Sequence, residues 1–274
     1  MTRGTIPFIK AHGAGNDFIV LDEQQSPIPE DLCQLAPGLC CRRTGVGADG
    51  ILVIRRANPI PAMECWNSDG SRAEACGNGL RVISLILSDG QEGDSTIDTD
   101  AGRVRVQQQS IDGQFAAEAD LGLAQVDSPR SFSVADTTLE AIPVNIGNPH
   151  LVVLIDPDAT TDPVRRFGPT LEYSVATRAN VGFVRIEARD RLVLRVWERG
   201  CGETLACGTG AAAAFAALQQ RGVIAETVLV QMPGGFLRVR AGEQGDLHVQ
   251  GPARISFAGQ LKLPEENSTL NSSS

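Results

Sequence analysis

Two cysteines of this 274-residue chain stand in closely similar surroundings. Cys76 lies in "NSDGSRAEACGNGLR" (67–81), and Cys207 lies in "ERGCGETLACGTGAAAA" (198–214). In both segments the cysteine opens a Cys-Gly-x-Gly sequence that leads into an apolar run typical of a helix. A helix start favours the thiolate form of a cysteine, and neighbouring glycines leave backbone N–H groups open to an anion. Each segment is therefore predicted to combine a reactive thiol with a cradle for a carboxylate.

Two such sites that face each other across one ligand could invert a stereocentre without a cofactor. One thiolate would remove a proton, and the opposite thiol would donate a proton on the other face. The helix N–H groups would stabilise the negative charge that grows on the neighbouring carboxylate. A cysteine is more often a small core residue, and this interpretation is our expectation for Cys33, Cys40, Cys41, Cys65 and Cys201. A disulfide between Cys76 and Cys207 is a further alternative.

The chain carries signs of an internal duplication. Tryptophans precede the two cysteines by the same ten residues, at Trp66 and Trp197. Upstream, "GNDFIVLD" begins at Gly15 and "GNPHLVVLID" begins at Gly147, in the same order as the two cysteines. We therefore expect two similar halves, 1–130 and 131–274, with a boundary in "AQVDSPRSFSVADTTLE" (124–140). Whether C-terminal strands cross back to close the first half is left open, and the last ten or so residues are polar and expected to be disordered.

The local pattern predicts many strands and few helices, and thus an α+β fold. Helices are predicted over 79–88 and 210–222, and the second is apolar nearly all round, which is typical of a buried helix. We expect a mainly antiparallel sheet wrapped around one central helix in each half. Alternating runs predict strands at 17–22, 49–56, 62–68, 102–108, 150–156, 182–188 and 191–198, and a hairpin at 227–242 with its turn at Pro233–Gly235.

Composition excludes several classes of function. Hydrophobic residues make up 42% of the chain and charged residues 21%, which indicates a packed globular protein. The net charge of −9 and the lack of a dense basic cluster argue against nucleic acid as a partner. No apolar run approaches the roughly 20 residues that span a bilayer, and the N-terminal segment lacks a signal-peptide pattern. Seven cysteines without a C-x-x-C pair and three histidines give little support for a zinc site. We therefore expect a cytoplasmic protein with free thiols.

Four segments together closely resemble the signature blocks of the diaminopimelate epimerase family. They are "HGAGNDF", "NSDGSRAEACGNGLR", "GNPH" and "ERGCGETLACGTGAAAA", in the family's order, from residue 12 to residue 214. The resemblance implies two pseudo-symmetric domains with the site in the cleft between them. It implies conversion of LL-diaminopimelate to the meso form, for lysine and cell-wall synthesis, without pyridoxal phosphate or metal. A homodimer is compatible with the sequence, which does not determine the oligomeric state.

The resemblance also assigns roles to residues. Cys76 and Cys207 would be the acid–base pair, with roles that swap with reaction direction. Glu198 and His150 would tune the thiols and contact the ammonium group. From the residues alone, Asn16, Asn67, Asn148 and Asn180 could each instead be a turn or cap residue. Glu198 and Arg199 could form a surface ion pair, and His150 could be a core histidine. The reacting carboxylate would be held by Gly77, Asn78, Gly208 and Thr209, and the rest of the substrate by Asn16, Asn67, Asn148, Asn180, Glu198 and Arg199.

The sequence departs from the family pattern at four positions. Gly50 stands where some members have a substrate-contacting glutamine, so we leave it out of the site. Thr209 replaces a serine but keeps the hydroxyl, and Ala75 and Trp66 replace residues that are usually methionine and phenylalanine. One alternative function is a cofactor-independent racemase of the same fold that acts on proline, hydroxyproline or histidine, with different distal contacts. Another is a redox thiol protein, in which the two cysteines act by forming a disulfide.

Overall fold

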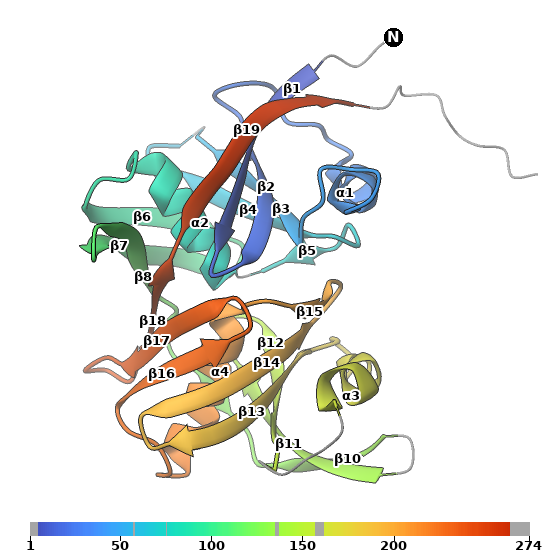
Figure 1. Ribbon diagram of the computed structural model, residues 1–274, viewed down its shortest axis with the longest axis vertical. Helices are drawn as coiled ribbons and strands as arrows, with labels where there is room; N and C mark the ends of the chain where they lie inside the picture. Colours follow the sequence, from blue (N-terminus) through green and yellow to red (C-terminus); the bar gives the residue numbers. More distant parts are fainter. Residues whose placement is uncertain (1–4, 57, 75, 135–136, 157–161, 264–274) are drawn as a thin grey trace, which may run out of the picture.

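The computed structural model describes residues 5–56, 58–74, 76–134, 137–156 and 162–263, and it has the predicted α+β architecture. In Figure 1 the first half of the chain lies above the second half. The predicted strands are present as β2 (Asn16–Asp22), β3 (Gly50–Arg55), β4 (Ala62–Asn67), β7 (Gly102–Ile111), β12 (Pro149–Leu154), β13 (Asn180–Ala188), β14 (Arg191–Glu198), β16 (Thr227–Met232) and β17 (Gly235–Ala241). The other strands are β1 (Thr5–Gly13), β5 (Arg72–Ala73), β6 (Gly93–Thr99), β8 (Gln114–Asp120), β9 (Gln125–Val126), β10 (Arg130–Val134), β11 (Thr137–Asn145), β15 (Gly202–Thr204), β18 (Leu247–Pro252) and β19 (Arg254–Lys262).

The same order of strand pairing occurs twice. In the first half β2 pairs in parallel with β3, which pairs antiparallel with β4. In the second half β12 pairs in parallel with β13, which pairs antiparallel with β14. Next, β4 and β14 each pair in parallel with the strand that follows the central helix, β6 or β16. Antiparallel meanders β6–β7–β8 and β16–β17–β18 complete the two series. This repetition supports the duplication that the sequence indicates.

The C-terminal strands return to the first half. Strand β18 pairs antiparallel with β8, and β19 pairs antiparallel with β1 along its whole length. Figure 1 shows β19, in red, running beside β1 at the top of the molecule. Strand β9 pairs with β11 of the second half, although it lies before residue 131, so the division into two domains near residue 130 stays a prediction. The polar tail at 264–274 lies outside the described residues.

One helix lies at the centre of each half. Helix α2 (Gly77–Leu87) packs against β1, β7 and β8, and α4 (Gly208–Gln220) packs against β11, β12, β13, β17 and β18. Every residue of α4 from Gly208 to Leu218 is buried, which confirms the prediction of a helix without a polar face. The alanines of this helix let the surrounding strands approach closely, and Phe215 fills the space at its centre. The two helices begin where the halves meet.

Two further helices were not predicted. Helix α1 (Leu32–Cys40) and helix α3 (Pro163–Glu172) follow β2 and β12, the equivalent strands of the two halves. Each buries one apolar side, including Leu35 in α1 and Leu171 in α3, against the outer face of its sheet. Both contain an internal proline, Pro37 or Pro169. None of the described helices has the length and apolar character needed to cross a membrane.

Candidate active site

Both cysteines cap the central helices, as predicted. Cys76 is the N-cap of α2, and its Sγ accepts a hydrogen bond from the Gly79 N–H at 3.3 Å. Cys207 is the N-cap of α4, and its Sγ accepts from the Gly210 N–H at 3.3 Å. A negative charge on either sulfur is therefore aligned with the positive end of a helix dipole.

The two helix starts meet backbone to backbone. A Cβ atom on Gly77 would lie 3.4 Å from the Gly208 Cα, and a Cβ atom on Gly208 would lie 3.2 Å from the Gly77 Cα. The Cβ atom would be tight at Gly208 and in ordinary van der Waals contact at Gly77, so the free N–H groups of the two helices lie close to one point. Asn78 fixes this arrangement, because its Nδ2 donates to Asn16 Oδ1 at 2.9 Å and to the Ala206 carbonyl at 2.8 Å. The result is one anion cradle built from both halves of the chain.

An enclosed pocket lies over this cradle. It holds about 30 Å³ of free space, which is room for about two water molecules. A ligand of amino-acid size therefore enters only if the walls move apart. The structure brings together all the sequence-predicted site residues except His150: the pocket is lined by Cys76, Cys207, Asn16, Asn67, Gly77, Asn78, Asn148, Asn180, Glu198, Arg199, Gly208 and Thr209. It also brings in Phe18, Asp49, Gly50, Cys65, Trp66, Ala73 and Cys201.

Glu198 and Cys207 are a buried acid and a buried thiol whose pKa values are both raised, chiefly by burial. Burial raises the pKa of Glu198 to about 7, against hydrogen bonds from the Thr204 hydroxyl and the Cys207 thiol. Burial and the neighbouring Glu198 carboxyl raise the pKa of Cys207 well above its ordinary value. Near neutral pH the protonated forms of this acid and this thiol are therefore both accessible. Such a pair can pass a proton to a ligand.

His150 lies one layer behind the pocket. Its side chain is buried, and its Nε2 is 2.9 Å from Asn148 Oδ1 and 3.5 Å from Asn180 Nδ2. Burial, with a contribution from Arg199, lowers the pKa of His150 to about 3, so the ring is neutral at physiological pH. His150 does not itself line the pocket, and its ring contacts two asparagines that do. Its predicted contact with an ammonium group stays a prediction.

Two asparagines that line the pocket also form hydrogen bonds that hold the neighbouring backbone in place. Asn67 accepts the Gly70 N–H in a turn at 3.0 Å, and its Nδ2 donates to Ser71 Oγ at 2.9 Å. Asn180 Oδ1 accepts the Arg199 N–H at 2.9 Å, which fixes the backbone beneath the Arg199 guanidinium. The turn interpretation and the pocket interpretation of Asn67 are thus compatible.

Arg199 pairs with a residue that the sequence did not single out. Its guanidinium forms an ion pair with the Glu74 carboxylate of the first half and donates to the Thr177 carbonyl at 3.3 Å. The Arg199 side chain is 13% exposed and that of Glu74 is 46% exposed. An ion pair between Glu198 and Arg199, the alternative from the sequence, is not the pairing observed among the described residues. Among the described residues that line the pocket, Arg199 is the arginine, and its guanidinium is already paired with a carboxylate of the protein.

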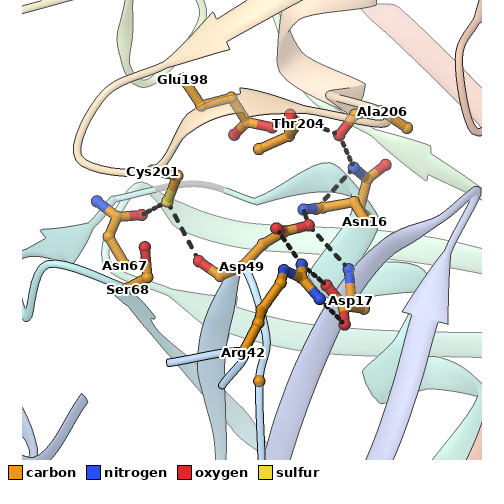
Figure 2. Close-up of polar contacts among 12 residues, drawn as sticks. Asn16, Asp17, Arg42, Asp49, Asn67, Ser68, Glu198, Cys201, Thr204 and Ala206 are labelled. Carbon is orange, nitrogen blue, oxygen red and sulfur yellow. Dashed lines mark hydrogen bonds and ion pairs between the residues drawn. The ribbon is translucent and has the colours of Figure 1, made fainter. Parts of the chain in front are cut away.

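Cys201 and Asp49 are polar parts of the pocket wall that the sequence interpretation missed. The Cys201 thiol donates to the Asp49 carbonyl at 3.2 Å and lies 3.7 Å from Asn67 Oδ1 (Figure 2). The Asp49 carboxylate accepts from Asn16 Nδ2 at 2.8 Å and from Arg42 at 2.7 Å (Figure 2). Cys201 was expected to be a small core residue; it is half-buried, and its hydrogen bond joins the two halves at the pocket. Cys65, also expected to be a core residue, is buried in the apolar cluster against which Cys76 packs.

Two of the residues that depart from the family pattern, Gly50 and Thr209, line the pocket. Gly50 lines the pocket, and a Cβ there would lie 2.5 Å from the Trp66 carbonyl oxygen, so a larger residue would require the strands to shift. Thr209 keeps its hydroxyl 3.6 Å from the Cys207 sulfur. Ala75 lies outside the described residues.

Comparison with known proteins gives a consistent result. The family described as diaminopimelate epimerase matches residues 8–126 and 142–255. A diaminopimelate epimerase of Acidiphilium cryptum is 40% identical over 93% of this chain and 96% of its own length. An O-ureido-serine racemase of Streptomyces lavendulae is 38% identical over 94% of this chain and 96% of its own length.

The solved structures support the fold alone. A probable proline racemase from Agrobacterium radiobacter superposes with a TM-score of 0.78 over 96% of this chain and 94% of that chain, at 16% sequence identity. The predicted fold class is confirmed by this likeness. The sequence relatives show that the protein is an isomerase, and the chain belongs to the diaminopimelate epimerase family.

Proposed function

We propose that this protein is a diaminopimelate epimerase that inverts one α-carbon of LL-diaminopimelate to give the meso isomer. The observation that carries the proposal is the meeting of two helix starts, each capped by a cysteine and each opened by a glycine, Gly77 or Gly208. A stereocentre has two faces, and this arrangement offers one thiol on each side of a single anion cradle. The duplication explains why the two sides match.

The proposed reaction exchanges two bonds to hydrogen. The thiolate of one cysteine takes the α-proton, so that an S–H bond forms as the C–H bond breaks. The carbanion that results is delocalised into its carboxylate, which the N–H groups at the starts of α2 and α4 stabilise. The thiol of the other cysteine then gives its proton to the opposite face, which leaves it as the thiolate. Charge is conserved, and Cys76 and Cys207 exchange roles in the reverse direction.

The distal half of diaminopimelate carries a second carboxylate and a second ammonium group. Arg199 is the cation suited to bind that carboxylate in a bidentate manner, and Asn67 and Asn180 line the same pocket. For this contact to form, the substrate carboxylate must replace Glu74 on the guanidinium. Because buried polar groups left without partners are costly, such a site would reject shorter amino acids.

A second candidate is a racemase for an amino acid whose side chain ends in an uncharged ureido group. The specific observation in its favour is the Streptomyces lavendulae relative, whose identity of 38% is close to that of the epimerases. The ion pair between Arg199 and Glu74 would then stay closed during the reaction, since no distal carboxylate would compete with it. The two candidates therefore differ at the distal end and share the two-cysteine chemistry.

Proton NMR in D₂O tests both candidates. The reduced protein is incubated separately with LL-diaminopimelate, O-ureido-L-serine and L-proline, and the α-proton signal and the stereoisomers are followed. The proposal predicts loss of the α-proton and appearance of the meso isomer with diaminopimelate alone. Exchange only with O-ureido-L-serine would favour the second candidate, and exchange only with proline would refute both.

Single-cysteine variants test the mechanism. We expect Cys76→Ala and Cys207→Ala each to reduce epimerisation at least about 10³-fold, because each removes an acid–base group in the path of the proton. Cys41→Ala is the matched control: hydrogen bonds from the Thr44 hydroxyl and the Arg43 N–H lower the pKa of this half-buried thiol to about 7, yet it lies outside the pocket. Near-normal turnover in either pocket variant would exclude the two-thiol mechanism.

A further inference from the structure

Glu172 is a buried carboxylate at the end of α3, and it contacts the chain on both sides of Arg199. Its side chain is 5% exposed. One oxygen, Oε2, accepts the indole N–H of Trp197 at 2.8 Å. The other oxygen, Oε1, accepts the Gly200 backbone N–H at 3.1 Å and the Arg178 Nε–H at 3.0 Å. A single carboxylate thus joins α3 to the end of β14, to the turn that follows β14 and to the segment that precedes β13.

These contacts fix the backbone around Arg199. Trp197 stands two residues before Arg199, and Gly200 follows it directly. Gly200 has a φ of +77°, a conformation that favours glycine, so the chain turns sharply at this point. The Arg199 N–H itself donates to Asn180 Oδ1 at 2.9 Å. The short segment that carries the Arg199 side chain is therefore held before, at and after this residue.

The Arg199 guanidinium depends on the same carboxylate from its other end. It donates to the Thr177 carbonyl at 3.3 Å. Thr177 precedes Arg178, whose Nε and Nη2 both donate to Glu172. The Ala179 N–H donates to the Glu172 backbone carbonyl at 3.0 Å. Arg178 has a φ of +54°, which a residue other than glycine keeps where the surrounding contacts hold it. The carbonyl that receives Arg199 is thus placed by the contacts of Glu172.

The charges at this end of the pocket form two separate pairs. Glu172 pairs with Arg178, and Arg199 pairs with Glu74. Arg199 lines the pocket. A buried carboxylate without a cation would compete for the nearest guanidinium. Because Arg178 supplies the positive charge beside Glu172, Arg199 is left available to a carboxylate in the pocket.

We propose that Glu172 is a positioning residue that sets the place of the Arg199 guanidinium and thereby the recognition of a distal carboxylate. Glu172 is not among the described residues that line the pocket, so its effect passes through Arg199. The effect runs through the Gly200 N–H on one side and through Arg178 and Thr177 on the other. A bidentate contact with a carboxylate requires both the place and the tilt of the guanidinium to be fixed. The part of this inference that concerns the substrate rests on the proposed function.

Glu172→Gln is the test variant. Glutamine keeps the size of the side chain and one oxygen that can accept a hydrogen bond, but it has no charge for Arg178 and places an NH₂ group where the second acceptor was. Glu118→Gln is the matched control. The Glu118 side chain is 11% exposed and pairs with Arg240, and neither residue lines the pocket. Urea unfolding of each variant establishes that the fold is intact.

The first measurement is amide hydrogen exchange of the protein without substrate, followed by mass spectrometry of overlapping peptides. We expect the Gly200 amide to exchange at least about 10-fold faster in Glu172→Gln than in the wild type, because it loses a hydrogen bond to a charged acceptor. In Glu118→Gln the Gly200 amide should exchange within about 2-fold of the wild-type rate. A wild-type rate at Gly200 in folded Glu172→Gln would overturn the inference.

The second measurement separates positioning of Arg199 from a general effect on the fold. We expect Glu172→Gln to raise KM for LL-diaminopimelate at least about 10-fold with kcat within about 2-fold, because the distal contact is the same in the ground state and the transition state. In an Arg199→Met background the same change should alter kcat/KM by less than about 2-fold, since the residue through which it acts is absent. An equal loss of kcat/KM in both backgrounds would show that Glu172 is merely structural and would refute the proposal.

A second variant keeps the test open if Glu172→Gln does not fold. Arg178→Met breaks the same ion pair from a side chain that is 29% exposed. Faster exchange at Gly200 and Ala179 in this variant supports the proposal, and wild-type exchange at both amides refutes it. Failure of the wild type to turn over diaminopimelate would refute the proposed substrate but would leave the exchange result intact, so the two failures are distinguishable.

Discussion

Replacement of Glu198 by glutamine is expected to change how the stability of the protein depends on pH. The Glu198 carboxyl lines the pocket, accepts a hydrogen bond from the Thr204 hydroxyl and has no cation partner among the described residues. Burial raises its pKa from an ordinary value of 4.5 to about 7. Glutamine keeps the size of the side chain and an oxygen that accepts from Thr204, but it cannot ionise. The variant therefore removes only the titration.

The direction and size of the effect follow from proton linkage. Because the folded state holds its proton up to about pH 7, the stability contributed by Glu198 is fully present below pH 4.5 and is lost as the pH rises through about 7. At about 1.4 kcal/mol per pH unit, the whole loss is about 3 kcal/mol, and about 2 kcal/mol of it falls between about pH 5.5 and pH 8. The free energy of unfolding of the wild type, minus that of Glu198→Gln, should fall by that amount over this interval.

Urea unfolding at a series of pH values, followed by circular dichroism and tryptophan fluorescence, measures this difference. Glu64→Gln is the matched control. Burial opposes ionisation of Glu64, but Arg55 and Arg72 hold the pKa of this carboxyl below its ordinary value. Glu64 is therefore ionised in both the folded and the unfolded state above about pH 5.5. The free energy of unfolding of the wild type, minus that of Glu64→Gln, should not change with pH in that range. The buried His150, which destabilises the fold as the pH falls below 6.5, is present in every variant and cancels.

A difference for Glu198→Gln that is flat to within about 0.5 kcal/mol, or that grows with pH, would refute this reasoning. It would mean that Glu198 is already ionised in the folded protein under weakly acidic conditions. Burial would then not control the pKa of this carboxyl, and the view of Glu198 as a proton-holding partner of Cys207 would fail with it.

Two further predictions concern the distal end and the core. Glu74→Gln should lower KM for a substrate with a distal carboxylate up to about 5-fold with kcat unchanged, because the half-exposed ion pair with Arg199 is worth at most about 1 kcal/mol; an unchanged KM in steady-state assays would show that Glu74 does not compete. Phe215→Ala in the buried centre of α4 should reduce the free energy of unfolding by about 3–5 kcal/mol. Phe236→Ala, at a position that is 50% exposed, should change it by less than about 0.5 kcal/mol in the same urea titration.

The elements that the sequence predicted well are those with a strong local pattern. Helix α4 has no polar face, and the hairpin of β16 and β17 turns at Pro233–Gly235 as expected. Helices α1 and α3 were missed because "LCQLAPGLC" and "PVRRFGPTLE" carry proline and glycine inside the helix, which locally indicate a turn. Packing against the outer face of a sheet overrides that propensity. One signal was available: Asp162 caps α3 and Pro163 follows it, a typical helix start.

The site residues also divide into those that a local sequence pattern indicates and those that it does not. Glycine and cysteine at a helix start leave a readable pattern, so Cys76 and Cys207 could be placed from the sequence. The contacts of Glu74 with Arg199 and of Cys201 with Asp49 join segments more than one hundred residues apart. No local pattern indicates such a contact, because it depends on how the two halves pack together.

The duplication accounts for both the symmetry and the asymmetry of the pocket. Strands β4 and β14 are equivalent, and they end at Asn67 and Glu198, so one half offers an amide where the other offers a carboxyl. Strands β3 and β13 are likewise equivalent, and they begin with Gly50 and Asn180. At the helix starts, by contrast, the two halves keep the same cysteine and the same glycine. Equal groups suit a reaction that must act on two faces of one carbon, and unequal groups suit the recognition of a substrate whose two ends must be told apart.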